Sequence, residues 1–402
     1  MSRINDLIKE LCPNGVEHKK LNEIADTFIG LATSVTKHKT SDGVILLHNS
    51  DIKQNKIVLK TIEFIDKGFA DKNVNKYYQY HDIATVHTGD VGTSAVIEEE
   101  YVGSMGFTTL VTRIYDFNYI NPYFLCHYFN SQLFKNDVSR VTISDRNNLN
   151  QKEFCQLLIP IPPLEVQNEI VRILDKFGEL EAELEAELEA RKSQYEFWRE
   201  KLLNTGNSNQ EYIILGDIGK VCMCKRIMKN ETSESGDVPF YKIGTFGKQA
   251  DAYISYDIFN DYKKRFSYPK KGEILVSCSG TIGRSVVFDG EDAYFQDSNI
   301  VWLSNDESKV LNKFLYYFYQ TSPWNISDGG TIKRLYNNQF ISAKVPLYSL
   351  EEQKKIVNIL ERFDKLINDI TVGLPAEIEL RRKQYEYYRN KLLSFEELSV
   401  SE

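Results

Sequence analysis

Two segments of the chain have near-copies further along the sequence, and this duplication constrains the fold more than any other feature. The segments LEVQNEIVRILDKF (164–177) and LEEQKKIVNILERF (350–363) share eight of fourteen residues. The segments RKSQYEFWREKLL (191–203) and RRKQYEYYRNKLL (381–393) share eight of thirteen. The offset is 186 positions for the first pair and 190 for the second, so the second copy is four residues longer. Such internal similarity predicts two copies of one structural unit.

Both copies have apolar residues three and four positions apart, which is the spacing of one face of a helix. We expect a long helix over 164–203, about 60 Å in length at 1.5 Å per residue, and a second over 350–393. Gly373-Leu374-Pro375 predicts a break, with Pro375 in the first turn of a restarted helix. Each helix has one apolar stripe, so the simplest partner for each is the other. An antiparallel pair would carry a globular domain at each end.

Within the first helical segment, residues 179–190 read ELEAELEAELEA, the same four-residue unit written three times. A packed core needs side chains of varied shape that interlock, and this repeat contains only Glu, Leu and Ala in a fixed order. The leucines would still meet a partner helix after a shift of one unit. The sequence therefore predicts a helix whose length can change in steps of four residues.

The remaining parts read as globular, with short apolar runs, many aromatic and β-branched residues, and Gly-containing turns. They also align with each other, as in DIATVHTGDVGTSAVI (82–97) and EILVSCSGTIGRSVVF (273–288). We expect mixed α/β (α+β) domains with a twisted or barrel-like sheet, separated by a coiled-coil spacer. The predicted division is a first domain (1–159), a first spacer helix (160–205), a second domain (206–344), and a second spacer helix with the C-terminal tail (345–402).

The net charge of -8 is unevenly distributed along the chain. The net charge, counted as Lys and Arg minus Asp and Glu, is -2 for 1–159, -5 for 160–205, +1 for 206–344 and -2 for 345–402. Nucleic-acid binding needs a local basic face rather than a basic total, so charge neither supports nor excludes DNA. No apolar run approaches a membrane span and no signal-peptide pattern is present, so we expect a cytoplasmic location without membrane association.

Motifs for catalysis or metal binding are weak. Asn121-Pro122-Tyr123-Phe124 lacks the second proline of an adenine-methyltransferase motif, and we interpret it as a strand-to-helix turn. No Gly-rich cofactor loop and no phosphate-binding GxxxxGK[ST] loop occurs. The six histidines and six cysteines have no metal-site spacing, and free thiols in a reducing cytosol are expected. The sequence predicts a non-catalytic chain with no cofactor and no metal.

The chain resembles the DNA specificity subunits of type I restriction–modification systems. The resemblance rests on two copies of P-x-x-x-E-Q-x-x-I-V-x-I-L, approximated by Pro163 to Leu174 and Pro346 to Leu360, and on two Q-Y-E-[FY]-[WY]-R-x-K-L-L endings. The GLPAEI segment (373–378) and the four-residue repeat add to it. It implies two target-recognition domains, each reading half of a bipartite double-stranded DNA site. It also implies helices that set the spacer, two methyltransferase subunits bound to them, and restriction (translocase) subunits that join for cleavage.

Phosphate contacts favour Lys, Arg, Ser, Thr and backbone amides in Gly-containing turns. In the first domain this selects Lys37, Lys39, Asn49, Ser50, Thr88, Gly89, Thr93 and Ser94. In the second it selects Lys225, Arg226, Lys242, Thr245, Lys263, Lys264, Arg265, Ser279, Gly280, Thr281, Arg284, Lys333 and Arg334. The alternative to a DNA contact for the basic stretch 262–265 is a solvated surface loop without a binding role. His48 and His87 are secondary candidates, with a structural role as the alternative.

Two other functions compete with DNA recognition by a non-catalytic subunit. One is a self-sufficient methyltransferase or nuclease, which would need a cofactor loop or a clustered acidic metal site. The other is a coiled-coil scaffold that binds no nucleic acid. Salt-dependent binding to a duplex with a bipartite site discriminates against the scaffold.

Overall fold

The structure is a computed structural model that describes residues 2–142, 148–203, 210–325 and 333–398. The chain divides into two compact units, Met1–Glu185 together with Glu377–Glu402, and Ala186–Ala376. Each unit contains both helices and sheets, which confirms the predicted mixed α/β class. Each unit also contains part of the long helices, because both boundaries between the units fall within helices.

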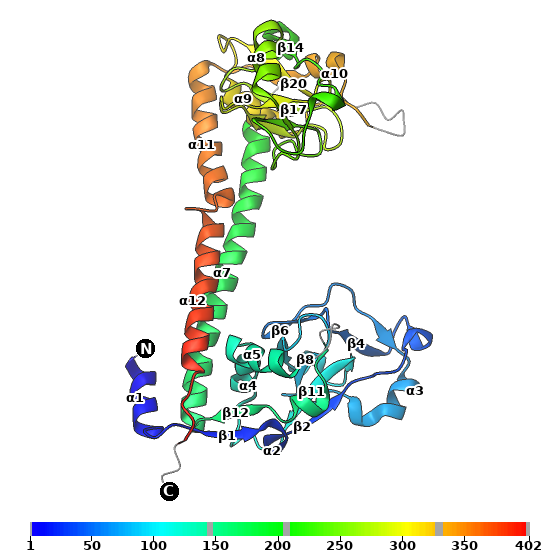
Figure 1. Ribbon diagram of the computed structural model, residues 1–402, viewed down its shortest axis with the longest axis vertical. Helices are drawn as coiled ribbons and strands as arrows, with labels where there is room; N and C mark the ends of the chain where they lie inside the picture. The colour runs from blue at the N-terminus through cyan, green and yellow to red at the C-terminus, as the bar shows by residue number, and fades with distance from the viewer. Residues whose placement is uncertain (1, 143–147, 204–209, 326–332, 399–402) are drawn as a thin grey trace. The chain divides into compact units, whose positions relative to one another are not determined.

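The long helices form where the sequence predicts them (Figure 1). Helix α7 (Leu164–Leu203) is uninterrupted over 40 residues. Its counterpart is divided into α11 (Leu350–Asn368) and α12 (Leu374–Leu392). A Cβ atom on Gly373 would lie 2.6 Å from the Asp369 carbonyl oxygen, so only glycine fits between the two helices. The predicted break and restart are confirmed.

Within each unit the paired helices are antiparallel, as the residue numbers of their contacts show. In the first unit the rings of Phe177 and Tyr388 stack with centroids 5.5 Å apart. Further along α7, Arg382 of α12 donates to Glu181 at 2.6 Å. In the second unit Tyr195 packs on Phe363 of α11, with centroids 6.3 Å apart, and Tyr348, just before α11, donates to the Leu202 carbonyl further along α7 at 3.1 Å. The apolar stripes are therefore buried against each other, as predicted.

Two four-stranded sheets form the first unit, joined by two small pairs of strands. The antiparallel sheet has the order β2 (Ala25–Ile29), β11 (Thr109–Ile114), β8 (Ile83–Val86), β9 (Ser94–Val96). The mixed sheet has the order β10 (Met105–Phe107), β4 (Val44–His48), β7 (Phe64–Ile65), β3 (Lys39–Thr40). The small pairs are β1 (Glu17–Lys20) with β12 (Leu158–Ile161), and β5 (Ile52–Lys53) with β6 (Lys56–Ile57).

Corresponding sheets form the second unit, with the antiparallel sheet in the same strand order and the mixed sheet one strand shorter. Its antiparallel sheet is β14 (Gly219–Cys222), β20 (Ile300–Asn305), β17 (Ile274–Ser277), β18 (Ser285–Val287). Its mixed sheet is β16 (Tyr253–Ile254), β15 (Val238–Tyr241), β19 (Tyr294–Phe295), and β13 (Tyr212–Ile214) pairs with β21 (Lys344–Pro346). Among the described strands, β3 and the β5–β6 hairpin have no counterpart here. The internal repeat in the sequence thus corresponds to a repeated fold.

Short helices surround the sheets in both units. The first unit has α1 (Ser2–Leu11), α2 (Leu21–Ile24), α3 (Lys67–Ala70), α4 (Pro122–Phe129), α5 (Gln132–Val141) and α6 (Gln151–Phe154). The second has α8 (Tyr256–Arg265), α9 (Asn312–Tyr319) and α10 (Asn337–Ile341). Helices α4 and α9 are almost entirely buried and belong to the hydrophobic cores that also take in the long helices. No helix in the described part of the chain is long and apolar enough to span a membrane.

Candidate nucleic-acid interface

The Gly-containing turns picked out in the sequence have the same structure in both units. After β8, Gly89 and Gly92 have φ values of 98° and 88°, and after β17, Gly280 and Gly283 have values of 64° and 84°. Such left-handed conformations favour glycine. In each turn the second glycine donates its amide back to the preceding strand, at 3.0 Å and 2.9 Å. The duplicated turns therefore present corresponding backbone amides and side chains.

In the first unit, most of the predicted residues surround one cavity of about 380 Å³, which we name the turn cavity. Asn49, Ser50, Thr88, Gly89 and Thr93 line it. Its walls also include two lysines and a single carboxylate. Hydroxyl, amide and ammonium groups beside one acid form a surface suited to a phosphate oxygen.

The other first-domain candidates lie outside the turn cavity. Ser94 is fully buried, and its hydroxyl bonds Thr85 at 2.8 Å, so its side chain has a structural role rather than a DNA contact. Lys39 pairs with Glu63 at 2.5 Å, and Lys37 is exposed on the adjacent 3-10 helix. Lys39 and the His48 imidazole together lower the pKa of the Glu63 carboxyl.

In the second unit, hydrogen bonds join the candidate turns. Arg284 donates to the Phe246 carbonyl at 2.9 Å, which links its turn to the one that contains Lys242 and Thr245. Ser279 donates to Asn299 at 2.9 Å. The remaining contacts on this side are Arg334 to the Ser298 carbonyl at 2.7 Å and Arg226 to Asp297 at 2.9 Å, with Lys333 next to Arg334 in sequence. Thr281 accepts from Arg284 at 3.4 Å. These residues form one polar cluster.

The basic stretch 262–265 is separate from this cluster. It forms the last turn of α8, so the surface-loop alternative is wrong. Lys263 pairs with Asp292 at 3.0 Å and Arg265 with Asp261 at 2.7 Å. The Lys264 side chain is exposed. Lys225 lies against the end of the same helix, with its ammonium 5.3 Å from the centre of the ring of Phe266, the C-cap residue. These residues add positive charge beside β16 and β19 without extending the turn cluster.

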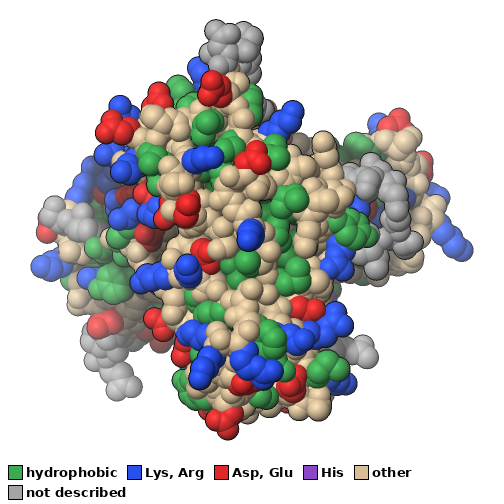
Figure 2. All heavy atoms as spheres, turned by 90° about the horizontal axis from the view of Figure 1, so that it is seen from above, with side chains coloured by type: hydrophobic (Ala, Val, Ile, Leu, Met, Phe, Trp, Pro, Cys, Tyr) green, Lys and Arg blue, Asp and Glu red, His purple; other side chains and the backbone are tan. Residues whose placement is uncertain are grey.

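The surface carries both signs of charge. Lys and Arg side chains are interspersed with Asp and Glu over the face shown in Figure 2. Local basic clusters, rather than a continuous basic face, are therefore the sites at which to look for phosphate contacts.

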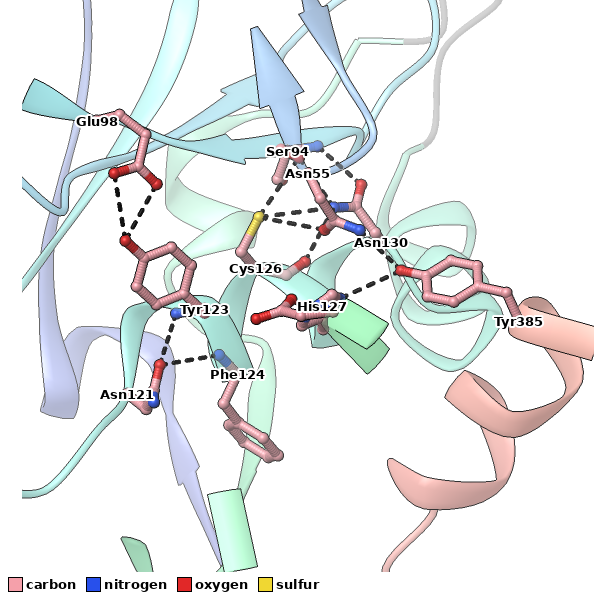
Figure 3. A network of polar contacts seen from close by, with 11 residues as sticks. Asn55, Ser94, Glu98, Asn121, Tyr123, Phe124, Cys126, His127, Asn130 and Tyr385 are labelled. Carbon is pink, nitrogen blue, oxygen red and sulfur yellow. Dashed lines mark hydrogen bonds and ion pairs between the residues drawn. The ribbon is translucent and has the colours of Figure 1, made fainter. Parts of the chain in front are cut away.

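The segment that resembles a methyltransferase motif serves as a helix cap. Asn121 is the N-cap of α4, and its side chain accepts from the amides of Tyr123 and Phe124 at 2.8 Å and 3.3 Å (Figure 3). Pro122 occupies the first helical position, where a missing amide hydrogen costs nothing. These contacts account for the motif structurally. Among the described residues no group of His, Cys, Asp and Glu is arranged to hold a metal.

The sequence prediction missed the residues that complete the turn cavity. Lys53 and Gln54, from the β5–β6 hairpin, and Lys135, from α5, also line it. The hairpin residues were missed because the β5–β6 turn contains no glycine. The available signal was two lysines flanking a polar pair between isoleucines, in IKQNKI (52–57).

The chain matches the family described as type I restriction modification DNA specificity domain over residues 13–190 and again over residues 207–380. A type I restriction enzyme specificity subunit of Haemophilus influenzae is 54% identical over 284 residues, which cover 69% of this chain and 73% of that protein. The EcoR124I/EcoR124II specificity subunit of Escherichia coli is 33% identical over 263 residues, covering 60% of this chain and 64% of that protein. Among solved structures, a chain from a study of assembly and conformational transition in a type I restriction–modification system has a TM-score of 0.62. It is 16% identical, and the match covers 95% of this chain and 98% of that one.

The chain therefore belongs to the family of DNA specificity subunits of type I restriction–modification systems. As a member of this family it provides sequence-specific DNA recognition and is not itself a catalytic subunit. The competing interpretations, a self-sufficient methyltransferase and a scaffold without nucleic acid, are not supported by these relatives.

Proposed function

We propose that each globular domain reads one half of a bipartite double-stranded DNA target. The observation that supports this most strongly is the repetition of the same antiparallel strand order and the same Gly-containing turn in the two units. Two copies of one DNA-reading surface on one chain suit two separated half-sites, in the way that dimeric proteins read spaced half-sites. The proposed domains are residues 1–159 and 206–344.

The DNA-facing surface of the first domain is the turn cavity, and that of the second is the polar cluster around Ser279 and Arg284. Both offer hydroxyls, backbone amides and cations, which are the groups that contact phosphates. Contacts to base edges, which give specificity, would come from the same turns. Lys37 and Lys39 in the first domain, and Lys263 to Arg265 in the second, extend the basic surface.

The long helices would set the spacer between the half-sites and bind two methyltransferase subunits, with restriction subunits joining for cleavage. We place the assembly in the cytoplasm, where host DNA is available to it. The helical segment 160–205 has a net charge of -5, so it is unsuited to lying along DNA and suited to a protein partner.

Domain exchange tests this function. Residues 1–159 are replaced by the first domain of another family member, and the methylated sequence is mapped with the methyltransferase subunits present. One half-site should change while the other stays the same, because each surface belongs to one domain. An exchange of residues 206–344 is the matched control and should change only the other half-site. A change in both half-sites after either exchange would refute independent reading.

A further inference from the structure

The β5–β6 hairpin brings two lysines together. Lys53 and Lys56 are directly opposite each other in the antiparallel pair, and both are exposed. Neither makes an ion pair with another residue that the structure describes. Like charges directly opposite each other destabilise a strand pair. An anion between or beside the two ammonium groups would remove this repulsion.

The hairpin lines two cavities that differ in their balance of charge. One is the turn cavity, whose charged residues are Lys53, Lys135 and Asp90. The other, of about 570 Å³, lies against α7 and α12 and contains four acidic and three basic residues. The acidic ones are Asp175, Glu181, Glu185 and Glu386, and the basic ones are Lys53, Lys56 and Arg382. Lys53 lines both cavities and the opposite Lys56 lines only the second, so the two ammonium groups lie at the border between them. The carboxylates of the second cavity favour a polyanion on the turn-cavity side of this border.

Asn55, in the turn between the two strands, holds the hairpin in place. Its φ of 59° is left-handed, a conformation that asparagine tolerates better than most residues. The backbone N–H of Asn55 donates to the carbonyl of buried Ser94 at 2.9 Å. Its side-chain oxygen accepts a hydrogen bond from the side chain of buried Asn130 at 2.7 Å. Its side-chain nitrogen donates to the Tyr385 hydroxyl of α12 at 2.7 Å (Figure 3). Helix α12 thus directly contacts the residue that fixes the two lysines.

The second unit offers a matched tyrosine with a different contact. Tyr195 occupies the place of Tyr385 in the first helical copy, at the same position of the Q-Y-E motif. Its hydroxyl donates to Gln320, the residue that caps the end of α9, at 3.1 Å. Tyr195 is therefore bonded to a helix end, whereas Tyr385 is bonded to a hairpin that carries cations.

We propose that Lys53 and Lys56 contact backbone phosphates of the first half-site, and that Asn55 and Tyr385 are positioning residues that hold these lysines toward the DNA. The proposal rests on the DNA-recognition function and adds a contact element outside the Gly-containing turns. It also gives α12 a direct connection to one DNA-contacting element.

The test measures how binding depends on salt, because each phosphate contact contributes about 0.9 to the slope of log K against log salt concentration. The chain is assembled with its methyltransferase subunits, and the probe is a duplex that carries the sequence methylated by that complex. K53Q/K56Q should reduce the slope by about 1.8 if both lysines contact phosphates. N55G keeps a left-handed backbone accessible but removes the side-chain anchor, and it should reduce the slope in the same direction. So should Y385F.

Three comparisons separate positioning from general damage. Y385F should cause no further reduction of the slope in the K53Q/K56Q background, because the lysines it positions are already gone. Y195F removes an equivalent hydroxyl and should leave the slope unchanged. K9Q removes an exposed charge from α1 and should also leave it unchanged. A loss of folded protein lowers the amount of active complex without changing the slope.

The contradicting results are distinct. If the wild-type complex does not bind the duplex, the proposed function fails. If it binds and K53Q/K56Q keeps the wild-type slope, the lysines do not contact phosphates and this proposal is refuted. If the lysine variant loses slope but both Y385F and N55G retain it, the positioning role is refuted.

Discussion

Deleting Glu183–Ala186 removes one unit of the ELEA repeat from α7 and should shorten the DNA spacer. Four residues correspond to about 6 Å of helix and about 400° of rotation, which leaves a net turn of about 40°. The half-sites themselves should stay the same, since neither proposed recognition surface is altered.

The structure shows why the deletion should be tolerated. Arg382 of α12 bonds Glu181 at 2.6 Å and Glu185 at 2.5 Å. After the deletion, Glu189 takes the place of Glu185, and Leu188 takes the place of Leu184. Because the unit repeats, the same charge pair and the same apolar contact form again. The helix pair therefore shifts its register without losing its packing.

DNA turns about 34° per base pair and rises about 3.4 Å. A rotation of about 40° corresponds to one base pair, and a shortening of about 6 Å to nearly two. We expect one, because a small tilt of the helices or a bend of the DNA absorbs a few ångströms. A loss of rotational phase would displace every base contact.

The assay is to map methylated sites in cells that express the deleted chain with its methyltransferase subunits. The spacer should be one base pair shorter, or at most two. E183Q/E187Q keeps the helix length while reducing its acidity, so it is the matched control and should leave the spacer unchanged. Full activity with an unchanged spacer after the deletion would mean that the repeat only makes a stable helix, and would refute the reasoning.

Three further outcomes are expected. The purified chain should neither methylate nor cleave DNA when supplied with methyl donor and magnesium, and turnover without partner subunits would contradict its non-catalytic role. D82A should lower the free energy of unfolding by about 3 kcal/mol in denaturant titrations, because buried Asp82 bonds Arg113 at 2.9 Å and 2.7 Å and raises the pKa of its guanidinium. Burial lowers the pKa of His87, so its contribution to stability is present above about pH 6.5 and is lost as pH falls through the folded pKa. H87N should therefore show a smaller loss of stability between pH 7 and pH 5 than the wild type, and an equal loss would refute this account.

The helices were predictable from the sequence because their signals are local and long. A stripe of apolar residues maintained along a helix of 40 residues leaves one choice of secondary structure. Gly373 followed by Leu374-Pro375 marks the break in the second copy directly. Sheet order depends on pairings between distant residues, such as β4 with β10, and the sequence predicted only that the two units would share it. The repeat supplied that information.

The candidate site was less accessible to sequence reasoning, for two physical reasons. The sequence could not show that the Ser94 side chain is buried. Alternation of polar and apolar residues identifies an exposed face only in a half-buried strand, and β9 is buried on both faces. The sequence also could not show that Lys53 and Lys56 are opposite each other, since that depends on the register of a two-residue turn. The Gly-containing turns could be predicted because their positive φ angles require glycine, and glycine is visible in the sequence.

The most direct test of the central claim is the methylation map of a host that expresses the wild-type chain with its methyltransferase subunits. The account predicts two short defined sequences separated by a spacer of fixed length and arbitrary composition. The defined halves should differ from each other, because the two domains differ in their exposed turn residues, with Asp90 in the first and Thr281 at the matching place in the second. A single continuous recognition sequence would contradict the assignment of one half-site to each domain.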